Sequence, residues 1–159
     1  TPQWVVNSDQ ARETFKAFRT PELGWKLITE KHLFVEGILP NSIVRELTEA
    51  EMERYREPFL DPDSRKPLWR FPNELPIDGE PADVFEAATA FNEWAMASNT
   101  PKLLFYAQPG AIFPEEVVRW CRDNLKNLET IDIGPGSHFI QEDNPHKIGS
   151  ETSKWYQSL

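Results

Sequence analysis

The sequence predicts an α/β protein with a doubly wound, mostly parallel sheet and an added helical portion. Two short apolar runs, KLLFYA (102–107) and LETIDIG (128–134), alternate with segments of helical pattern in the second half of the chain. Such alternation is typical of parallel strands covered by helices. The first half instead has helical patterns separated by prolines. We therefore expect a helical domain at residues 1–80 and part of an α/β domain at residues 81–159.

The first half is expected to begin with two helices. A helix over 8–20 has Ser8 or Asp9 in position to act as its N-cap. The segment 22–40 has apolar residues at helical spacing throughout, which predicts one continuous helix ended by Pro40.

A third helix and a long loop are expected to complete the first half. In the segment 47–59, Thr48 and Glu51 have the spacing of a capping box, which marks a helix N-terminus. The segment 60–81 is rich in proline and shows little periodicity, so we expect it to be a loop.

The second half is expected to run helix, strand, helix, strand, helix. The helical patterns cover 81–98, 114–125 and 144–159, the last with Asn144 as its cap. The nearly continuous apolar run at 102–107 is typical of a strand buried on both faces. Two strands are too few for a stable parallel sheet, because their edges need partners. We therefore expect this chain to be the C-terminal part of a larger α/β domain.

Composition excludes several classes of protein and site. The net charge of −9 argues against a nucleic-acid partner and against an anionic membrane surface. A single cysteine excludes an internal disulfide, and one cysteine with three scattered histidines makes no Cys/His metal cluster. There is no apolar run of the ~20 residues that span a membrane, and no signal segment. We expect a soluble, cytoplasmic protein without a bound metal.

His138 is the candidate catalytic residue. It follows the second predicted strand by a few residues, and ligands of parallel α/β sheets bind at the carboxyl ends of the strands. Gly134 and Gly136 would allow a sharp turn there. Position alone leaves open whether His138 is a general base or only a hydrogen-bonding loop residue. The chain has no Gly-x-nucleophile-x-Gly elbow, and no acid follows the first strand before Glu115, so a base would need partners from outside this chain.

Other chemically active side chains are expected to have no catalytic role. His32 and His146 fall in helical patterns and are expected at the surface. Cys121 has no histidine at a useful spacing and is expected to be inert. The acidic run at 141–143 is expected to cap the last helix.

Several runs together resemble one family. They are YREPFLDPDSRKPLWRFPNELPIDGEPADV and GPGSHFIQEDNPHKIGSE, with the shorter KAFRT, FVEGILP, LTEAEMERYREPF and PKLLFYAQPG. In this combination and order they resemble the haloalkane dehalogenases, α/β-hydrolases that cleave carbon–halogen bonds. The resemblance covers essentially all 159 residues. It implies an α/β-hydrolase fold with a helical cap, of which this chain holds the cap, the last two strands and the last helices.

The resemblance also implies a two-step reaction without a cofactor. An aspartate nucleophile in a His-Asp-Trp motif displaces halide to form an alkyl-enzyme ester, and a histidine then activates the water that hydrolyses it. His138 matches that histidine. The nucleophile, the halide-holding Asn and Trp and the catalytic acid match nothing here and are expected on the N-terminal half of the fold. The absence of an acid after 102–107 is most similar to the subgroup whose acid is a Glu just before the cap.

The resemblance implies positions for the pocket that takes a small apolar halogenated substrate and its halide ion. The residues facing halide and substrate would be Phe15, Phe34, Phe71 and Pro72. The residues lining the cavity or its tunnel would be Ile38, Leu75, Ala111, Ile112 and Phe139. Ordinary core packing is the alternative for each.

Three other functions stay open. A luciferase-like activity or epoxide hydrolysis could use the same fold, although epoxide hydrolases need cap tyrosines and Tyr55 is the only tyrosine in the predicted cap. The chain could also be a non-catalytic piece of a split or engineered labelling protein. Labelling variants replace the base, so the presence of His138 argues against that last use.

Overall fold

The computed structural model describes residues 9–159 and divides the chain into two compact units. Unit 1 holds the described residues up to Asn41 together with Leu47–Thr89, and unit 2 holds Ser42–Glu46 and Ala90–Leu159. The expected cap at Ser8 or Asp9 lies outside the residues whose side chains are described.

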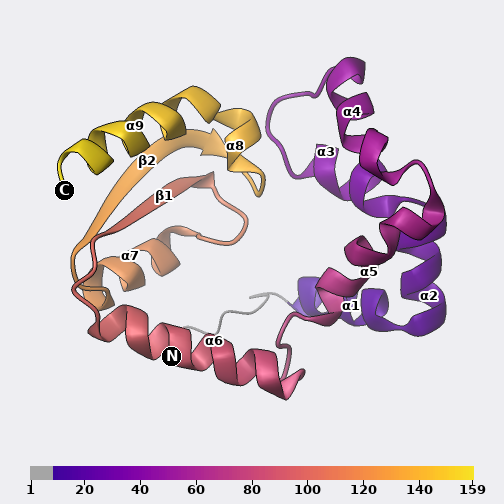
Figure 1. Ribbon diagram of the computed structural model, residues 1–159, viewed down its shortest axis with the longest axis horizontal. Coiled ribbons are helices and arrows are strands. Elements are labelled where there is room, and N and C mark those ends of the chain that lie inside the picture. Colours follow the sequence, from indigo (N-terminus) through magenta and orange to yellow (C-terminus); the bar gives the residue numbers. More distant parts are fainter. Residues whose placement is uncertain (1–8) are drawn as a thin grey trace. The chain divides into compact units, whose positions relative to one another are not determined.

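Unit 1 is built from short helices (Figure 1). Its elements are α1 (Asp9–Arg19), α2 (Pro21–Trp25), the π-helical turns η1 (Lys26–Glu30) and η2 (Phe34–Ile38), α3 (Leu39–Asn41), α4 (Glu49–Arg56), the 3₁₀ turns η3 (Glu57–Phe59) and η4 (Pro62–Arg65), and α5 (Lys66–Asn73). The long helix α6 (Ala82–Ala97) begins in unit 1 and ends in unit 2.

The expected continuous helix over 22–40 is wrong. The helical path breaks at His32, whose φ of 53° lies in the left-handed region that a right-handed helix cannot include. The pieces on either side, η1 and η2, are π-helical. Pro40 does not end the segment either but lies within α3, because its fixed φ suits the first turn of a helix.

The expected loop over 60–81 is also wrong, since it contains η4 and α5. The Asp61 carboxylate accepts a hydrogen bond from the amide of Asp63 and caps η4. Pro67 lies in the first turn of α5, where a missing N–H breaks no helical hydrogen bond. The Trp69 indole donates to the Phe18 carbonyl at 3.1 Å, which joins α5 to α1. Prolines in this segment therefore begin helices as well as turns.

The capping box of α4 is confirmed. The Thr48 hydroxyl accepts from the amide of Glu51, and the Glu51 carboxylate accepts from the amide of Thr48 at 2.7 Å.

Unit 2 contains the expected parallel strand pair, β1 (Lys102–Pro109) and β2 (Leu128–Gly136). Three further helices complete it: α7 (Glu115–Asn124), α8 (Ile140–Asp143) and α9 (Pro145–Gln157). Figure 1 shows α7 and α9 on opposite faces of the strands, as in a doubly wound layer. The core of unit 2 includes Ala107, Val118, Cys121 and Ile133. Most of β1 is only half-buried within this chain, against the expectation of full burial.

Candidate active site

His138 lies two residues beyond the end of β2, at the carboxyl end of the strand pair, as expected. The strand register shifts near this end, where Tyr106 faces Asp132 but Gln108 faces Pro135. This extra residue in β2 is a bulge, a feature that bends a strand. Gly134 lies in the bulge with a φ of 97°, and its amide donates to the Asp132 carboxylate at 2.8 Å. Gly134 therefore has the positive φ that suits a glycine, but it lies in a bulge of β2 and not in the turn that was expected.

Gly136 is needed for a different reason from the one expected. Its φ is not positive, but a Cβ at this position would lie 2.7 Å from the Cβ of Ala107. A side chain there would force β1 and β2 apart next to the histidine loop. Gly136 therefore permits a close approach of the strands.

The backbone of His138 is fixed by a segment from far earlier in the chain. The carbonyl of Ser42 accepts hydrogen bonds from the amides of both His138, at 3.0 Å, and Phe139, at 3.2 Å. The rings of His138 and Phe139 meet edge to face, with centroids 4.6 Å apart. Backbone and ring contacts together hold the imidazole in place.

A cavity of about 200 Å³ adjoins the imidazole. Three of the predicted site residues, Ala111, Ile112 and His138, line it together, while Phe139 contacts the His138 ring. Aromatic and aliphatic side chains from β1 and the following turn make up most of the rest, including Phe105 and Phe113. No Asp or Glu of the described chain lines this cavity. It therefore suits an apolar ligand, with His138 as the candidate base.

The surroundings of His138 favour its neutral form. His138 is exposed as a whole residue, but its ring is partly desolvated, and this desolvation lowers the pKa of His138. Within the described residues the imidazole has no charged partner that would offset this effect. A neutral imidazole at pH 7 can accept a proton from water, which is what a general base must do.

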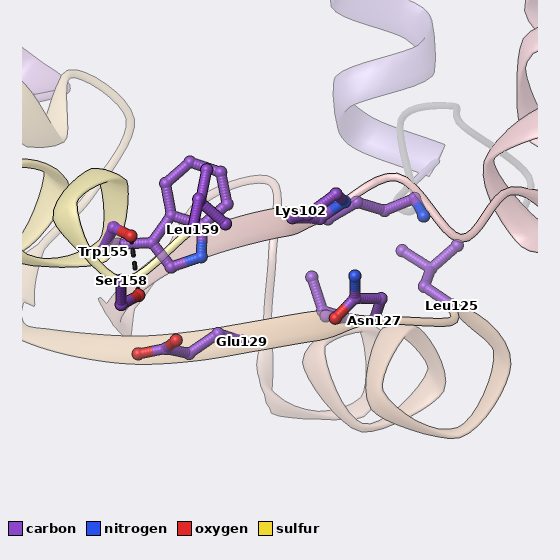
Figure 2. A pocket seen from close by; sticks show the side chains of 9 residues that line it. Lys102, Leu125, Asn127, Glu129, Trp155, Ser158 and Leu159 are labelled. Carbon is purple, nitrogen blue, oxygen red and sulfur yellow. Dashed lines mark hydrogen bonds between the residues drawn. The ribbon is translucent and has the colours of Figure 1, made fainter.

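A larger cavity of about 520 Å³ lies at the other end of the strands (Figure 2). It is lined by residues at the start of β1 and β2 and by Trp155, Ser158 and Leu159 at the end of the chain. The charged side chain of Lys102 in this cavity already donates to the backbone carbonyls of Ser98, Thr100 and Lys126, so its hydrogen bonds are made within the protein. Amino ends of parallel strands are not where such sheets bind ligands, so we assign the site to the smaller cavity.

Six of the predicted pocket residues lie in unit 1. Phe15 and Phe34 both contact Phe18, with ring centroids at 6.0 and 5.7 Å. Phe71 is 72% exposed, whereas Pro72 beside it is buried and its carbonyl accepts from the Arg19 guanidinium. The other two, Ile38 and Leu75, are half-buried.

The three remaining expectations for titratable groups have different outcomes. His146 is exposed, as expected. The surface position expected for His32 is wrong, since only 6% of it is exposed. Cys121 is buried, and burial raises the pKa of its thiol, which supports the expectation of an inert side chain. No group of three or more His, Cys, Asp or Glu in residues 9–159 could hold a metal ion.

The acidic run 141–143 and Asn144 do not cap α9. The side-chain amide of Asn144 instead donates to the Pro135 carbonyl at 2.6 Å. Glu142 and Asp143 bind the segment Ser42–Glu46 through its backbone and through Arg45. The sequence carried no sign of these contacts, because the partners are almost 100 residues apart.

Comparison with proteins of known sequence gives haloalkane dehalogenases among the relatives of this chain. A haloalkane dehalogenase of Mesorhizobium japonicum is 47% identical over 147 residues, covering 92% of this chain and 47% of the relative. One of Sphingobium indicum is 39% identical over 158 residues, covering 99% of this chain and 52% of the relative. No protein-family model matches the chain. The chain thus spans about half the length of the curated relatives it matches.

Solved structures agree with the sequence relatives. The crystal structure of haloalkane dehalogenase DbeA from Bradyrhizobium elkani superposes with a TM-score of 0.91 at 45% identity, over 95% of this chain and 52% of that one. DatA from Agrobacterium tumefaciens C58 gives 0.84 at 29% identity, with the same coverage of each chain. The fold is therefore part of an α/β-hydrolase with a helical cap, as expected. Within that class the chain is a homologue of the haloalkane dehalogenases over nearly its whole length.

None of the helices in residues 9–159 is both long enough and apolar enough to cross a membrane.

Proposed function

We propose that this chain is part of a haloalkane dehalogenase that converts a haloalkane to an alcohol, a halide ion and a proton. The observation that carries the proposal is the position of His138 beside a largely apolar cavity at the carboxyl ends of the strands. The homology of the whole chain to haloalkane dehalogenases supports it. The substrate is a small apolar halogenated molecule, and the reaction as proposed uses no cofactor or metal.

The proposed reaction has two steps. A carboxylate from the remainder of the fold attacks the carbon that bears the halogen, the carbon–halogen bond breaks, and the halide leaves with its electron pair. Water then attacks the resulting ester while His138 takes a proton from it, which frees the carboxylate and releases the alcohol. The first step removes no proton, so only the second step depends on His138.

The pocket residues take supporting roles in this proposal. Phe15, Phe34, Phe71 and Pro72 of the cap face the halide and substrate. In the complete protein, Ile38, Leu75, Ala111, Ile112 and Phe139 would line the tunnel that leads the substrate to the site. Apolar side chains suit such a substrate and exclude water from the leaving halide.

We also propose a partner for this chain, the N-terminal half of the fold, and a location, the cytoplasm. The nucleophile, the acid and the halide-binding Asn and Trp are supplied by the N-terminal half of the fold. A cytoplasmic location is supported by the single cysteine, a buried free thiol. Epoxide hydrolysis has less support, because it needs tyrosine acids and the cap of this chain offers Tyr55 alone.

Replacing His138 tests the proposal. In the protein assembled with the rest of its fold, His138→Gln should release about one halide per active site and then stop, since the ester forms but is not hydrolysed. Intact-protein mass spectrometry should show the added alkyl group. His146→Gln, at an exposed histidine, is the matched control and should turn over normally. Sustained turnover by His138→Gln, with no adduct, would show that His138 is a structural residue.

A further inference from the structure

The four-residue helix α8 directly follows the histidine loop and depends on contacts from elsewhere in unit 2. Phe139 stands at its N-cap position and provides no side-chain hydrogen bond to the helix. A helix of one turn is not stable by itself. The segment Ser42–Glu46, which joins α3 to α4 in the sequence, supplies the contacts that α8 lacks.

Asp143 anchors the backbone of this segment. One of its carboxylate oxygens accepts from the amides of Val44 and Arg45, both at 3.0 Å, and the other accepts from Val44 at 3.2 Å. Hydrogen bonds to an ionised carboxylate are stronger than those between neutral groups. The carboxylate thereby fixes two consecutive peptide units of the segment against the end of α8.

Arg45 holds the same segment through its side chain. Its Nε donates to the backbone carbonyl of Glu142 at 2.7 Å, and its Nη2 donates to the Glu142 carboxylate at 2.8 Å. The planar guanidinium suits such a double contact, which fixes direction as well as distance.

The segment in turn holds the histidine. The carbonyl of Ser42, two residues before Val44, accepts from the amides of His138 and Phe139. The stretch 138–143 is therefore fixed at its start by Ser42 and at its end by Asp143 and Glu142. Since no hydrogen bond of the His138 ring occurs within the described residues, these backbone anchors and the Phe139 ring set where the imidazole lies.

We propose that Asp143 and Arg45 are positioning residues for His138, acting through the Ser42 carbonyl. This inference rests on the proposed function and extends it. A catalytic base displaced by about 1 Å can lose about 100-fold in rate. Because only the ester hydrolysis uses His138, loss of these anchors should slow that step and spare the release of the first halide.

The kinetic test uses the protein assembled with the rest of its fold. In Asp143→Ala, rapid-mixing assays should show the first halide released within about twofold of the wild-type rate. Ester hydrolysis should slow by about 10- to 100-fold, and the alkyl adduct should accumulate. Asp143→Asn keeps an acceptor oxygen and should recover most of the rate, and Arg45→Lys should give a milder defect of the same kind. Gln141→Ala, an exposed residue of α8, is the matched control.

Amide exchange tests the anchoring without any substrate. Hydrogen exchange at the amides of His138 and Phe139 should be faster in Asp143→Ala than in the wild type or Gln141→Ala. Faster exchange shows that Asp143 holds the backbone of His138, whether or not the assembled protein is active. If the assembled wild-type protein releases no halide, only the proposed function fails. Unchanged exchange at these two amides overturns the inference. Equal slowing of both chemical steps, in proportion to lost folded protein, overturns it as well.

Discussion

His32 is a buried histidine, although the helical pattern around it predicts a surface position. Its imidazole is buried, and its Nε2 has no hydrogen-bond partner within the described residues. The ring packs edge to face on Phe59, with centroids 6.0 Å apart. Desolvation lowers the pKa of His32, and the positive charges of Arg65 and Arg56 lower it further, against an opposing effect of Glu36. The folded state therefore favours the neutral imidazole.

We expect His32 to make unit 1 less stable in acid. Because its pKa is lower in the folded than in the unfolded chain, the unfolded chain binds the proton more readily below pH 6.5, about the value for an unperturbed histidine. The free energy of unfolding should thus be at its full value above that pH. The free energy of unfolding should fall as the pH drops toward the pKa of His32 in the folded state. Below that pKa, His32 should cause no further change.

Urea unfolding of the protein assembled with the rest of its fold, at pH 5 and pH 7.5 and followed by tryptophan fluorescence, checks this expectation. His32→Asn, an amide that tolerates a positive φ, should reduce the pH dependence. It should not abolish it, because the pKa of His138 is lowered in the same direction. His146→Asn is the control and should leave the dependence as it is. An identical pH dependence in wild type and His32→Asn would contradict the argument.

The sequence predicted residue positions where they follow from local rules. His138 was found at the carboxyl end of the strand pair because strand order and strand ends are visible in the apolar runs. The burial of His32 was missed, since a left-handed residue within a helical pattern leaves no periodic sign. The role of Asp143 was missed because it depends on amides 98 and 99 residues away.

Helices and strands could also be predicted where the signals for them are local in the sequence. The capping box of α4 and the apolar runs of β1 and β2 were predicted correctly. The helix α5 is not evident from the sequence, because its prolines are equally typical of a loop and its anchor, the Trp69 bond to the Phe18 carbonyl, is a tertiary contact. Prolines that begin a helix and prolines that end one look alike until such contacts are known.

The N-cap of α4 is expected to contribute to the free energy of unfolding. Thr48→Ala removes the acceptor for the Glu51 amide and one of the partners of the Glu51 carboxylate, so it should lower the free energy of unfolding by about 1 kcal/mol. Thr48→Ser keeps the hydroxyl and should lie within a few tenths of a kcal/mol of the wild type. Urea unfolding of the three proteins, each assembled with the rest of its fold, measures both differences. Equal stability of the Ala and Ser variants would mean that the cap contributes nothing.

At the scale of the whole molecule, the alternation of helix and strand was enough to predict the α/β class and the parallel pairing. Parallel strands joined through a helix are an arrangement that sequence order alone implies. The division of the chain was harder to predict. The sequence changes character near residue 80, whereas unit 2 includes the early segment Ser42–Glu46 and the change from unit 1 to unit 2 along the chain falls within α6. The functional boundary between cap and main domain stays a prediction.

The 159 residues by themselves are expected to self-associate. Large apolar side chains on α6 are open to solvent, with Phe91 54% and Trp94 51% exposed. Within the described residues, β1 and β2 pair only with each other, so each offers a free edge. Exposed apolar surface and open strand edges favour self-association. The purified chain should therefore form oligomers or aggregates, which size-exclusion chromatography with light scattering would detect.

The same chain should release no halide from 1-bromobutane or 1,2-dibromoethane. The cavity beside His138 has a base but no carboxylate among the described residues that could attack carbon, and a base without a nucleophile cannot begin the reaction. Refolding the chain together with the N-terminal half of a relative should restore halide release, and His138→Gln in the same mixture should reduce it to a single event per site. Halide release by the 159-residue chain alone would show that it carries a nucleophile of its own, and the proposed division of the catalytic residues would then be wrong.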